Sequence, residues 1–248
     1  MKAMIFAAGL GTRLRPLTND RPKALVEVGG YPLLEIALRR LLAFGYEEVV
    51  VNVHHFADQI EDFLQRNNNF GAVIHISDER KQLLDTGGGL RKAAKWLQGG
   101  DSFLVHNADI LTDLDLHALR RAHEASGALA TLAVRDRKTS RYLLFDEAGL
   151  LSGWKNAKTG EEKISRAVPS TTALAFSGIQ YLHPRLFDYM PEQEAFSIID
   201  VYLNAARSAK IAGFRHEHSQ WLDVGKPDAL EPAAELARAL SASGFTGY

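Results

Sequence analysis

The 248-residue chain carries 29 Lys and Arg residues against 30 Asp and Glu residues, which gives a formal net charge of −1. This balance excludes a basic nucleic-acid surface and a polybasic membrane patch, and the absence of cysteine excludes disulfides and thiolate metal sites. No stretch approaches the ~20 apolar residues of a membrane span, and the N-terminal apolar run is too short for a secretion signal. We therefore expect a cytoplasmic protein with neither a nucleic-acid nor a membrane partner.

Strand-like runs alternate with amphipathic helical stretches through the first half of the chain. This alternation is typical of a mostly parallel sheet that is covered by helices on both faces. We therefore predict a Rossmann-like α/β fold of three layers around a mostly parallel, mixed central sheet. The expected strands are 3–7, 48–53, 72–77 and 102–105, and the expected helices are 33–44, 57–66, 89–97 and 114–124.

The second half of the chain is richer in expected strands. No linker separates it from the first half, and the sequence shows no internal repeat. We expect a single domain over residues 1–240, whose part over about 126–240 is a small β-rich extension, and a flexible tail over 241–248. The expected elements are a strand at 129–134, a hairpin at 142–154, a mobile polar loop at 155–170, strands at 174–181 and 211–215, and helices at 198–206 and 227–240.

The first expected strand ends in the loop Ala7-Ala8-Gly9-Leu10-Gly11-Thr12-Arg13. Such small residues leave backbone N–H groups open to a ligand, and an arginine beside them can grip a phosphate with two hydrogen bonds. A tight turn would explain the glycines alone, but the nearby cations Arg13, Arg15 and Lys23 favour a phosphate site.

Two common phosphate-binding motifs are excluded for this loop. A GxGxxG dinucleotide fingerprint would need glycine where the chain has Leu14, and Pro16 interrupts the helix that should open there. No GK[ST] sequence follows, so the loop is not a P-loop either.

Two aspartates are candidates for a magnesium site. Asp109 follows an expected buried strand, where open α/β sheets bind ligands, and Asp223 stands in the similar setting Trp221-Leu222-Asp223-Val224-Gly225. Either residue alone could be a helix cap or a turn former. Beside a cationic loop, however, the pair indicates Mg²⁺, which prefers carboxylate oxygens and substrate phosphates.

Two glycine-containing segments each allow two interpretations. Asp85-Thr86-Gly87-Gly88-Gly89 is either a flexible turn into a helix or a bare backbone edge for a flat base. Phe176-Ser177-Gly178-Ile179 is either a strand with a bulge or the floor of a sugar site. Four histidines lack the setting of a metal site, and we expect them in loops or on the surface: His54, His55, His216 and His218.

With these residues in view, the chain resembles the sugar-1-phosphate nucleotidyltransferases, also called nucleoside-diphosphate-sugar pyrophosphorylases. The residues from Ala7 to Thr18, followed by Arg21-Pro22-Lys23-Ala24-Leu25, match the family signature at almost every position. The resemblance continues through Asp109 and ends at Trp221-Leu222-Asp223-Val224-Gly225-Lys226-Pro227. The two glycine-containing segments are most similar to those of the short, single-domain N-acetylmuramate-1-phosphate uridylyltransferases, whose relatives include mannose-1-phosphate guanylyltransferase-like members.

The resemblance implies an Mg²⁺-dependent enzyme of nucleotide-sugar biosynthesis, with a role in cell-wall recycling. It would transfer a nucleotidyl group from a nucleoside triphosphate, here UTP, to a sugar 1-phosphate, here N-acetylmuramate 1-phosphate, and release pyrophosphate. The nucleotide-binding part would span about 1–125 and the sugar-binding part about 126–240, in a monomer or small homo-oligomer. The implied roles are catalysis for Arg13 and Lys23, nucleotide binding for Ala8, Gly9, Gly11, Thr12, Thr86 and Gly88, sugar binding for Asn107, Gly178 and Asp200, and metal binding for Asp109 and Asp223.

One position departs from the family pattern. Relatives usually have glycine immediately before the metal aspartate, where this chain has Ala108. The additional methyl group is expected to leave the carboxylate in place and to narrow the ribose or sugar pocket.

Three alternative functions remain open at this point. The first is mannose-1-phosphate guanylyl transfer, and the second is cytidylyl transfer to phosphocholine, which an aromatic box around the cationic headgroup would favour. The third is a catalytically silent nucleotide-binding regulatory subunit. Such proteins often lose the cations or the metal carboxylates, so the presence of all four charged residues favours an active enzyme: Arg13, Lys23, Asp109 and Asp223.

Overall fold

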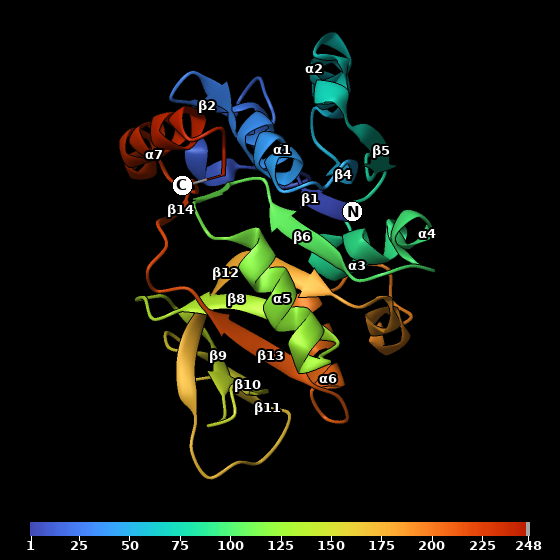
Figure 1. Ribbon diagram of the computed structural model, residues 1–248, viewed down its shortest axis with the longest axis vertical. Helices are drawn as coiled ribbons and strands as arrows, with labels where there is room; N and C mark the ends of the chain where they lie inside the picture. The colour runs from blue at the N-terminus through green and yellow to red at the C-terminus, as the bar shows by residue number, and fades with distance from the viewer. Residues whose placement is uncertain (247–248) are drawn as a thin grey trace.

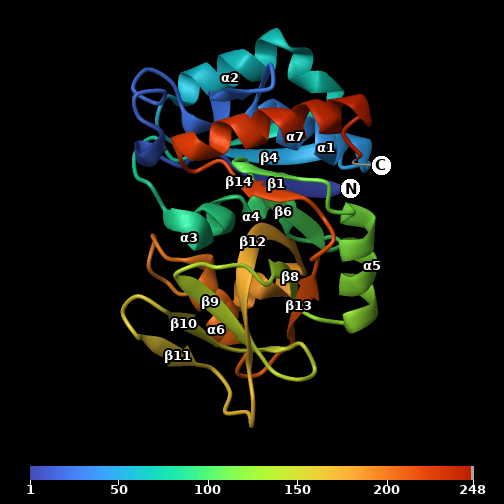
Figure 2. The same cartoon turned by 90° about the vertical axis from the view of Figure 1, so that its left-hand side faces the viewer.

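A ten-stranded sheet runs through the molecule in the computed structural model, which describes residues 1–246 (Figures 1 and 2). At its centre, β1 (Lys2–Phe6) lies between β4 (Glu48–Val53) and β6 (Phe103–Asn107), and the three strands are parallel. The strand β5 (Val73–Asp78) continues this parallel part beyond β4. None of the helices within residues 1–246 is both long and apolar enough to cross a membrane.

The long strand β12 (Thr172–Leu182) joins the second half of the chain to the first, because it pairs antiparallel with β6. The other strands of the second half extend the sheet from β12 and make it a mixed sheet. The prediction of a Rossmann-like α/β fold around a mixed central sheet is thus confirmed. These strands are β8 (Ala130–Arg135), β9 (Arg141–Phe145), β10 (Leu151–Asn156), β11 (Glu162–Ile164) and β13 (Ile211–Arg215).

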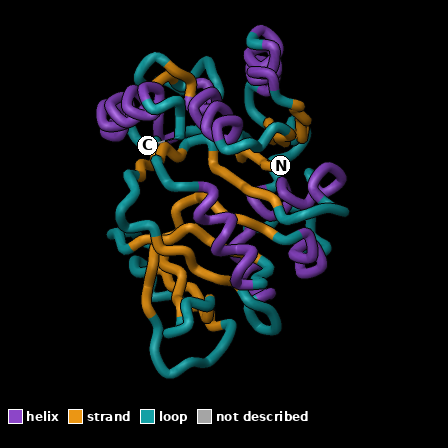
Figure 3. Tube along the Cα trace, viewed as in Figure 1, coloured by secondary structure: helices purple, strands orange, loops and turns teal. Residues whose placement is uncertain are grey.

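Helices cover both faces of the sheet, as Figure 3 shows along the Cα trace. Within β1, Ala3 and Ile5 pack into one apolar cluster and Met4 into the other, because successive side chains of a strand point to opposite faces. The first cluster includes α1 (Leu33–Ala43), α2 (Ala57–Arg66) and α5 (Leu116–Ser126). The second includes α3 (Asp85–Lys92), α4 (Ala94–Leu97) and α6 (Ile198–Ala205).

A third apolar cluster joins the C-terminal helix α7 (Leu230–Ala242) to α1 and to the loop after β1. Leu14 of the short helix η1 (Thr12–Leu14) is fully buried in this cluster. The last helix therefore supports the loop that the sequence assigns to phosphate binding. The remaining short elements of the chain are η2 (Lys23–Leu25), β2 (Glu27–Val28), β3 (Tyr31–Pro32), η3 (Asn68–Gly71), η4 (Pro184–Tyr189) and η5 (Pro227–Ala229).

Two segments that were expected to be mobile contain secondary structure or packing contacts within the described residues. The expected loop over 155–170 contains β11, which pairs with β10 as a second hairpin. The expected flexible tail continues α7 to Ala242, and Phe245 packs edge-on against the Tyr31 ring at 5.7 Å between ring centroids. Polar composition predicted neither feature, because the first depends on backbone pairing with the adjacent strand and the second on a contact with a residue distant in sequence. Residues 247–248 of the expected tail lie outside the described residues.

Packing adds detail to two further expectations. Helix α3 begins at Asp85, before the start expected at residue 89, so Gly87 and Gly88 lie inside the helix rather than in a turn that precedes it. His216 lies in a loop, as expected, but its side chain is buried, with its Nε2 atom 2.7 Å from Ser177 Oγ and its Nδ1 atom 2.6 Å from Ser219 Oγ. Burial lowers the pKa of His216 to about 4, so this histidine is neutral in the folded protein at neutral pH.

The packing of α3 generates a stability prediction. A methyl group at Gly88 would lie 2.2 Å from the Glu194 carbonyl oxygen, so Gly88→Ala must displace backbone. We expect a loss of about 1–3 kcal/mol in the free energy of urea unfolding, although alanine ordinarily favours a helix. The control is Gly9→Ala, where the new methyl group has no neighbour within 4 Å. A Gly88→Ala protein as stable as wild type would contradict this packing.

Candidate active site

The loop after β1 is shaped by two contacts that reach it from elsewhere in the chain. The Ala7 N–H donates to Asn52 Oδ1 at 2.7 Å, and the Thr18 hydroxyl donates to the Gly11 carbonyl at 2.9 Å. Gly11 has a φ of +64°, and a Cβ there would lie 2.9 Å from Cβ of Lys23. Glycine is therefore required at this turn, which folds the loop back onto Lys23.

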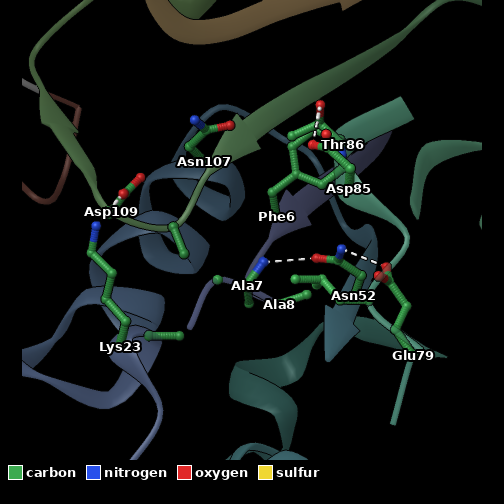
Figure 4. Close-up of a pocket in the computed structure, with 14 residues that line it drawn as sticks. Phe6, Ala7, Ala8, Lys23, Asn52, Glu79, Asp85, Thr86, Asn107 and Asp109 are labelled. Atoms are coloured by element: carbon green, nitrogen blue, oxygen red, sulfur yellow. Dashed lines mark hydrogen bonds and ion pairs between the residues drawn. The ribbon is translucent and has the colours of Figure 1, made fainter. Parts of the chain in front are cut away.

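A pocket opens at the carboxyl ends of β1, β4 and β6 (Figure 4), where open α/β sheets bind ligands. A methyl group at Gly9 would meet nothing within 4 Å, so the backbone there is open to the pocket. The loop, the strand ends and the start of α3 all contribute to the lining. The lining residues are Phe6, Ala7, Ala8, Gly9, Lys23, Ala24, Asn52, Glu79, Leu83, Asp85, Thr86, Asn107, Ala108 and Asp109.

Asp109 and Asp223 come together through a short two-stranded sheet. In it, β14 (Trp221–Asp223) pairs antiparallel with β7 (Ile110–Thr112), and Asp223 lies opposite Ile110. The next amide, Val224 N–H, donates to the Asp109 carbonyl at 2.9 Å. A C-terminal segment is thus placed beside the residue that follows β6.

Positive side chains surround these carboxylates. The Lys23 ammonium forms an ion pair with Asp109 Oδ2, as Figure 4 shows. A Cβ at Gly225 would lie 2.8 Å from Asp223 Oδ1 and 3.0 Å from Arg13 Nη2, so glycine at 225 leaves room for both groups. Arg13 also borders a second hollow, together with Asp223 and Lys226.

Burial and the neighbouring charges shift the pKa of the Asp223 carboxyl. Burial raises the pKa of the Asp223 carboxyl, and the neighbouring charge of Asp109 raises it further, whereas Lys23, Arg13 and Arg137 act in the opposite direction. Two carboxylates that repel each other in a partly buried site are stabilised by a nearby cation.

The donor set fits a divalent ion of the magnesium type. Mg²⁺ usually binds one or two protein carboxylates and takes its remaining oxygen ligands from substrate phosphates and water. Asp109 and Asp223 supply that number of carboxylates. In the part of the chain that the structure describes, no cluster of three or more His, Asp or Glu residues forms a fuller metal site.

Of the residues assigned to base recognition, only Thr86 lines the pocket. Its hydroxyl accepts a hydrogen bond from Ile198 N–H at 3.0 Å, which ties the start of α3 to α6. Gly88 packs against the backbone of Glu194 and is not among the lining residues. Thr12, assigned to the nucleotide, lies exposed in η1 and is not among the lining residues either.

The residues assigned to the sugar lie in two places. Asn107 lines the pocket at the end of β6, and Gly178 is its neighbour, since a Cβ on Gly178 would lie 2.8 Å from Asn107 Nδ2. Gly178 has a φ of +75° inside the bulge expected in β12, where the pairing register with β8 shifts. Asp200 lies apart on α6, where its carboxylate pairs with Lys163 of β11 at 2.9 Å.

Sequence reasoning missed a buried hydrogen-bond chain behind the loop. Asn52 donates to Glu79 Oε1 at 2.7 Å, and the other carboxylate oxygen accepts from Leu84 N–H at 3.1 Å. Glu79 is 1% exposed, and burial raises the pKa of its carboxyl. The polar residues at the carboxyl ends of the two strands were the available signal: Asn52 is the second-last residue of β4, and Glu79 directly follows β5.

Comparison with known proteins identifies the family of this chain. A family model described as nucleotidyl transferase matches residues 2–239. The chain is 35% identical to N-acetylmuramate alpha-1-phosphate uridylyltransferase of Caulobacter vibrioides, with 96% of this chain and 97% of that protein covered. It is 34% identical to the protein of the same name from Neisseria meningitidis serogroup B, with 96% and 99% covered.

Solved structures show the same fold. The structure titled HddC from Yersinia pseudotuberculosis complexed with GMP-PN superposes with a TM-score of 0.75 at 22% identity, over 94% of this chain and 98% of that one. A putative glucose-1-phosphate thymidylyltransferase from Bacillus anthracis gives a TM-score of 0.79 at 20% identity, over 96% and 95%. The family model and the two related uridylyltransferases match this chain over nearly its whole length. The chain therefore belongs to the nucleotidyl transferase family, among the sugar-1-phosphate nucleotidyltransferases.

Proposed function

We propose that this protein transfers a uridylyl group from UTP to N-acetylmuramate 1-phosphate, with Mg²⁺, and releases pyrophosphate. The observation that carries the reaction is the meeting of Arg13 and Lys23 with Asp109 and Asp223 beside an open backbone loop. The choice of base and sugar follows the two relatives named as N-acetylmuramate alpha-1-phosphate uridylyltransferases, which align with the chain over nearly their whole length.

In the proposed complex the nucleotide extends from the base side of the pocket to the cationic loop. The base lies near Thr86, and the backbone at Ala8 and Gly9, which line the pocket, binds the phosphates through its N–H groups. Gly11 does not line the pocket and contributes by turning the loop back onto Lys23. The sugar lies on the other side, near Asn107 and Gly178. Gly88 and Asp200 would act through the position of their helices, since neither lines the pocket.

The sugar phosphate already carries an anionic nucleophile, so no general base is needed. One of its oxygens attacks the α-phosphorus, the bond to the bridging oxygen of the β-phosphate breaks, and that electron pair leaves with pyrophosphate. Two unit charges 4 Å apart repel by roughly 4 kcal/mol at an effective dielectric of about 20, and several phosphate charges meet here. Compensating positive charge is therefore the main requirement of the site.

Different groups of the site would supply this positive charge at different phosphates. Lys23, next to Asp109, would face the α-phosphate and the attacking oxygen, while Arg13 would hold the β- and γ-phosphates as pyrophosphate leaves. Mg²⁺, held by Asp109 and Asp223, would neutralise phosphate charge and help to align the reacting oxygens. The backbone loop holds the chain of phosphates in place without a side chain in the way.

The test of the proposed function is pyrophosphate release in the presence of Mg²⁺. UTP, GTP, CTP, dTTP and ATP are crossed against N-acetylmuramate, N-acetylglucosamine, glucose and mannose 1-phosphates and phosphocholine. We expect the strongest signal for UTP with N-acetylmuramate 1-phosphate. If pyrophosphate release is strongest for GTP with mannose 1-phosphate or for CTP with phosphocholine, that pair is the substrate pair instead. If folded protein binds nucleotide but releases no pyrophosphate with any pair, the protein is a regulatory subunit.

Removing either metal carboxylate should stop turnover without unfolding the protein. We expect Asp109→Asn and Asp223→Asn each to lower kcat by more than about 100-fold, because each loses a charged oxygen ligand for the metal. Pyrophosphate release at saturating Mg²⁺ measures this, and thermal unfolding confirms that the variants are folded. The control is Asp188→Asn at an exposed position. Near-normal turnover in a folded variant would refute the metal assignment.

Arg13→Ala should affect the chemical step rather than sugar binding. Removing a donor that stabilises the leaving group typically costs ~10²–10³ in rate, so we expect kcat to fall by about that factor. The KM for the sugar 1-phosphate should stay near the wild-type value in initial-rate measurements. Arg66→Ala, an exposed arginine on α2, is the matched control. A change confined to the KM of the sugar 1-phosphate would place Arg13 at the sugar instead.

A further inference from the structure

The loop after β8 places a third cationic side chain near Asp223, in addition to Lys23 and Arg13. Arg137 lies over the indole of Trp221, with its Cζ atom 4.3 Å from the ring centroid. Its Nη2 atom donates to the Phe176 carbonyl at 3.0 Å. An arginine that is both stacked on an aromatic ring and hydrogen-bonded to a carbonyl has little conformational freedom. The guanidinium is therefore held in position by β14 and β12 together.

The positive charge of Arg137 has no direct carboxylate partner within residues 1–246. Its one hydrogen bond there goes to the Phe176 carbonyl, and its Nε atom is buried without any partner. Burial lowers the pKa of Arg137, while the charge of Asp223 acts in the opposite direction across the site. A partly buried cation without a contacting anion is costly, so this arrangement favours the arrival of an anionic ligand.

The surroundings of Arg137 belong to the sugar side of the site. Trp221 and Asp223 are two residues apart on β14, so their side chains point to the same face of that strand. The Trp221 indole N–H donates to the Ser177 carbonyl at 2.8 Å, next to Gly178 in the bulge of β12. Arg137 thus borders the space between the metal carboxylates and the bulge.

We propose that Arg137 binds the phosphate of the sugar 1-phosphate and positions it for attack, an inference that rests on the proposed function. Nη1 has no hydrogen-bond partner among the described residues, which leaves it as the donor for a phosphate oxygen. Arg13 and Lys23 come from the N-terminal loop, whereas Arg137 comes from the second half of the chain. Arg13 and Lys23 then bind the triphosphate, and Arg137 binds the attacking phosphate.

The experiment compares wild-type protein with Arg137→Gln, Arg137→Lys and the control Lys138→Gln, which removes a neighbouring exposed charge. We expect Arg137→Gln to raise the KM for the sugar 1-phosphate by about 10- to 100-fold, the usual range for a lost charged hydrogen bond. The KM for the nucleoside triphosphate should not change. Arg137→Lys should recover part of the loss, which a merely structural role of the side chain would not produce, and Lys138→Gln should match wild type.

Substrates that differ in charge identify the group that is bound. N-acetylmuramate 1-phosphate carries a carboxylate in addition to its phosphate, whereas glucose and N-acetylglucosamine 1-phosphates carry the phosphate alone. An equal loss of affinity for all three supports binding of the phosphate. A loss confined to N-acetylmuramate 1-phosphate, or no change in any KM, overturns the proposal.

Calorimetric binding of the three sugar 1-phosphates separates this inference from the proposed function. If wild-type protein binds one of them without turnover, the proposed function fails, and weaker binding by Arg137→Gln still supports the role of Arg137. If wild-type protein turns over a sugar 1-phosphate and Arg137→Gln binds it equally well, the inference fails while the function stands. Absence of binding to wild-type protein overturns both.

Discussion

The pairing of β14 with β7 is the constraint on which the rest of the site depends. It brings Asp223 from the end of the chain to Asp109, and the Val224 amide holds the two segments together. Because like charges repel at close range, this arrangement is stable only if cations or a metal lie near. The loop after β1 supplies such a cation, since Lys23 pairs with Asp109, and α7 supports this loop by packing in the same apolar cluster as Leu14.

Charge compensation in this protein comes from separate parts of the chain. Lys23 forms an ion pair with Asp109. Arg13 lies near Asp223 in space that a side chain at Gly225 would occupy. Arg137, from the second half of the chain, stacks on Trp221 of the same strand as Asp223. The chain has a net charge of only −1, so the affinity for anions must be local. A reaction that joins two polyanions needs this local concentration of positive charge more than it needs a proton-transfer group.

Glycines shape the site by allowing close approach, and they do so in two ways. At Gly9 the backbone is open to the pocket, which suits a phosphate contact. At Gly88 the same residue type instead allows α3 to pack against the backbone of Glu194. The segment before α6 therefore lies close against α3, and the hydrogen bond from Ile198 N–H to the Thr86 hydroxyl ties the start of α6 to the pocket wall.

The sequence by itself determined the layered fold and predicted most of the charged residues that meet at the candidate site. Alternating apolar runs predict the parallel strands because buried strands and amphipathic helices have different periods, and a long specific motif predicts the loop with Arg13 and Lys23. Only the tertiary structure decided which residues meet. Asn52, Glu79 and Arg137 escaped prediction because their roles arise from partners that are distant in sequence, which local patterns do not encode. Packing between remote parts of the chain also places Phe245 against Tyr31, whereas the strand within residues 155–170 is held by pairing with its sequence neighbour β10.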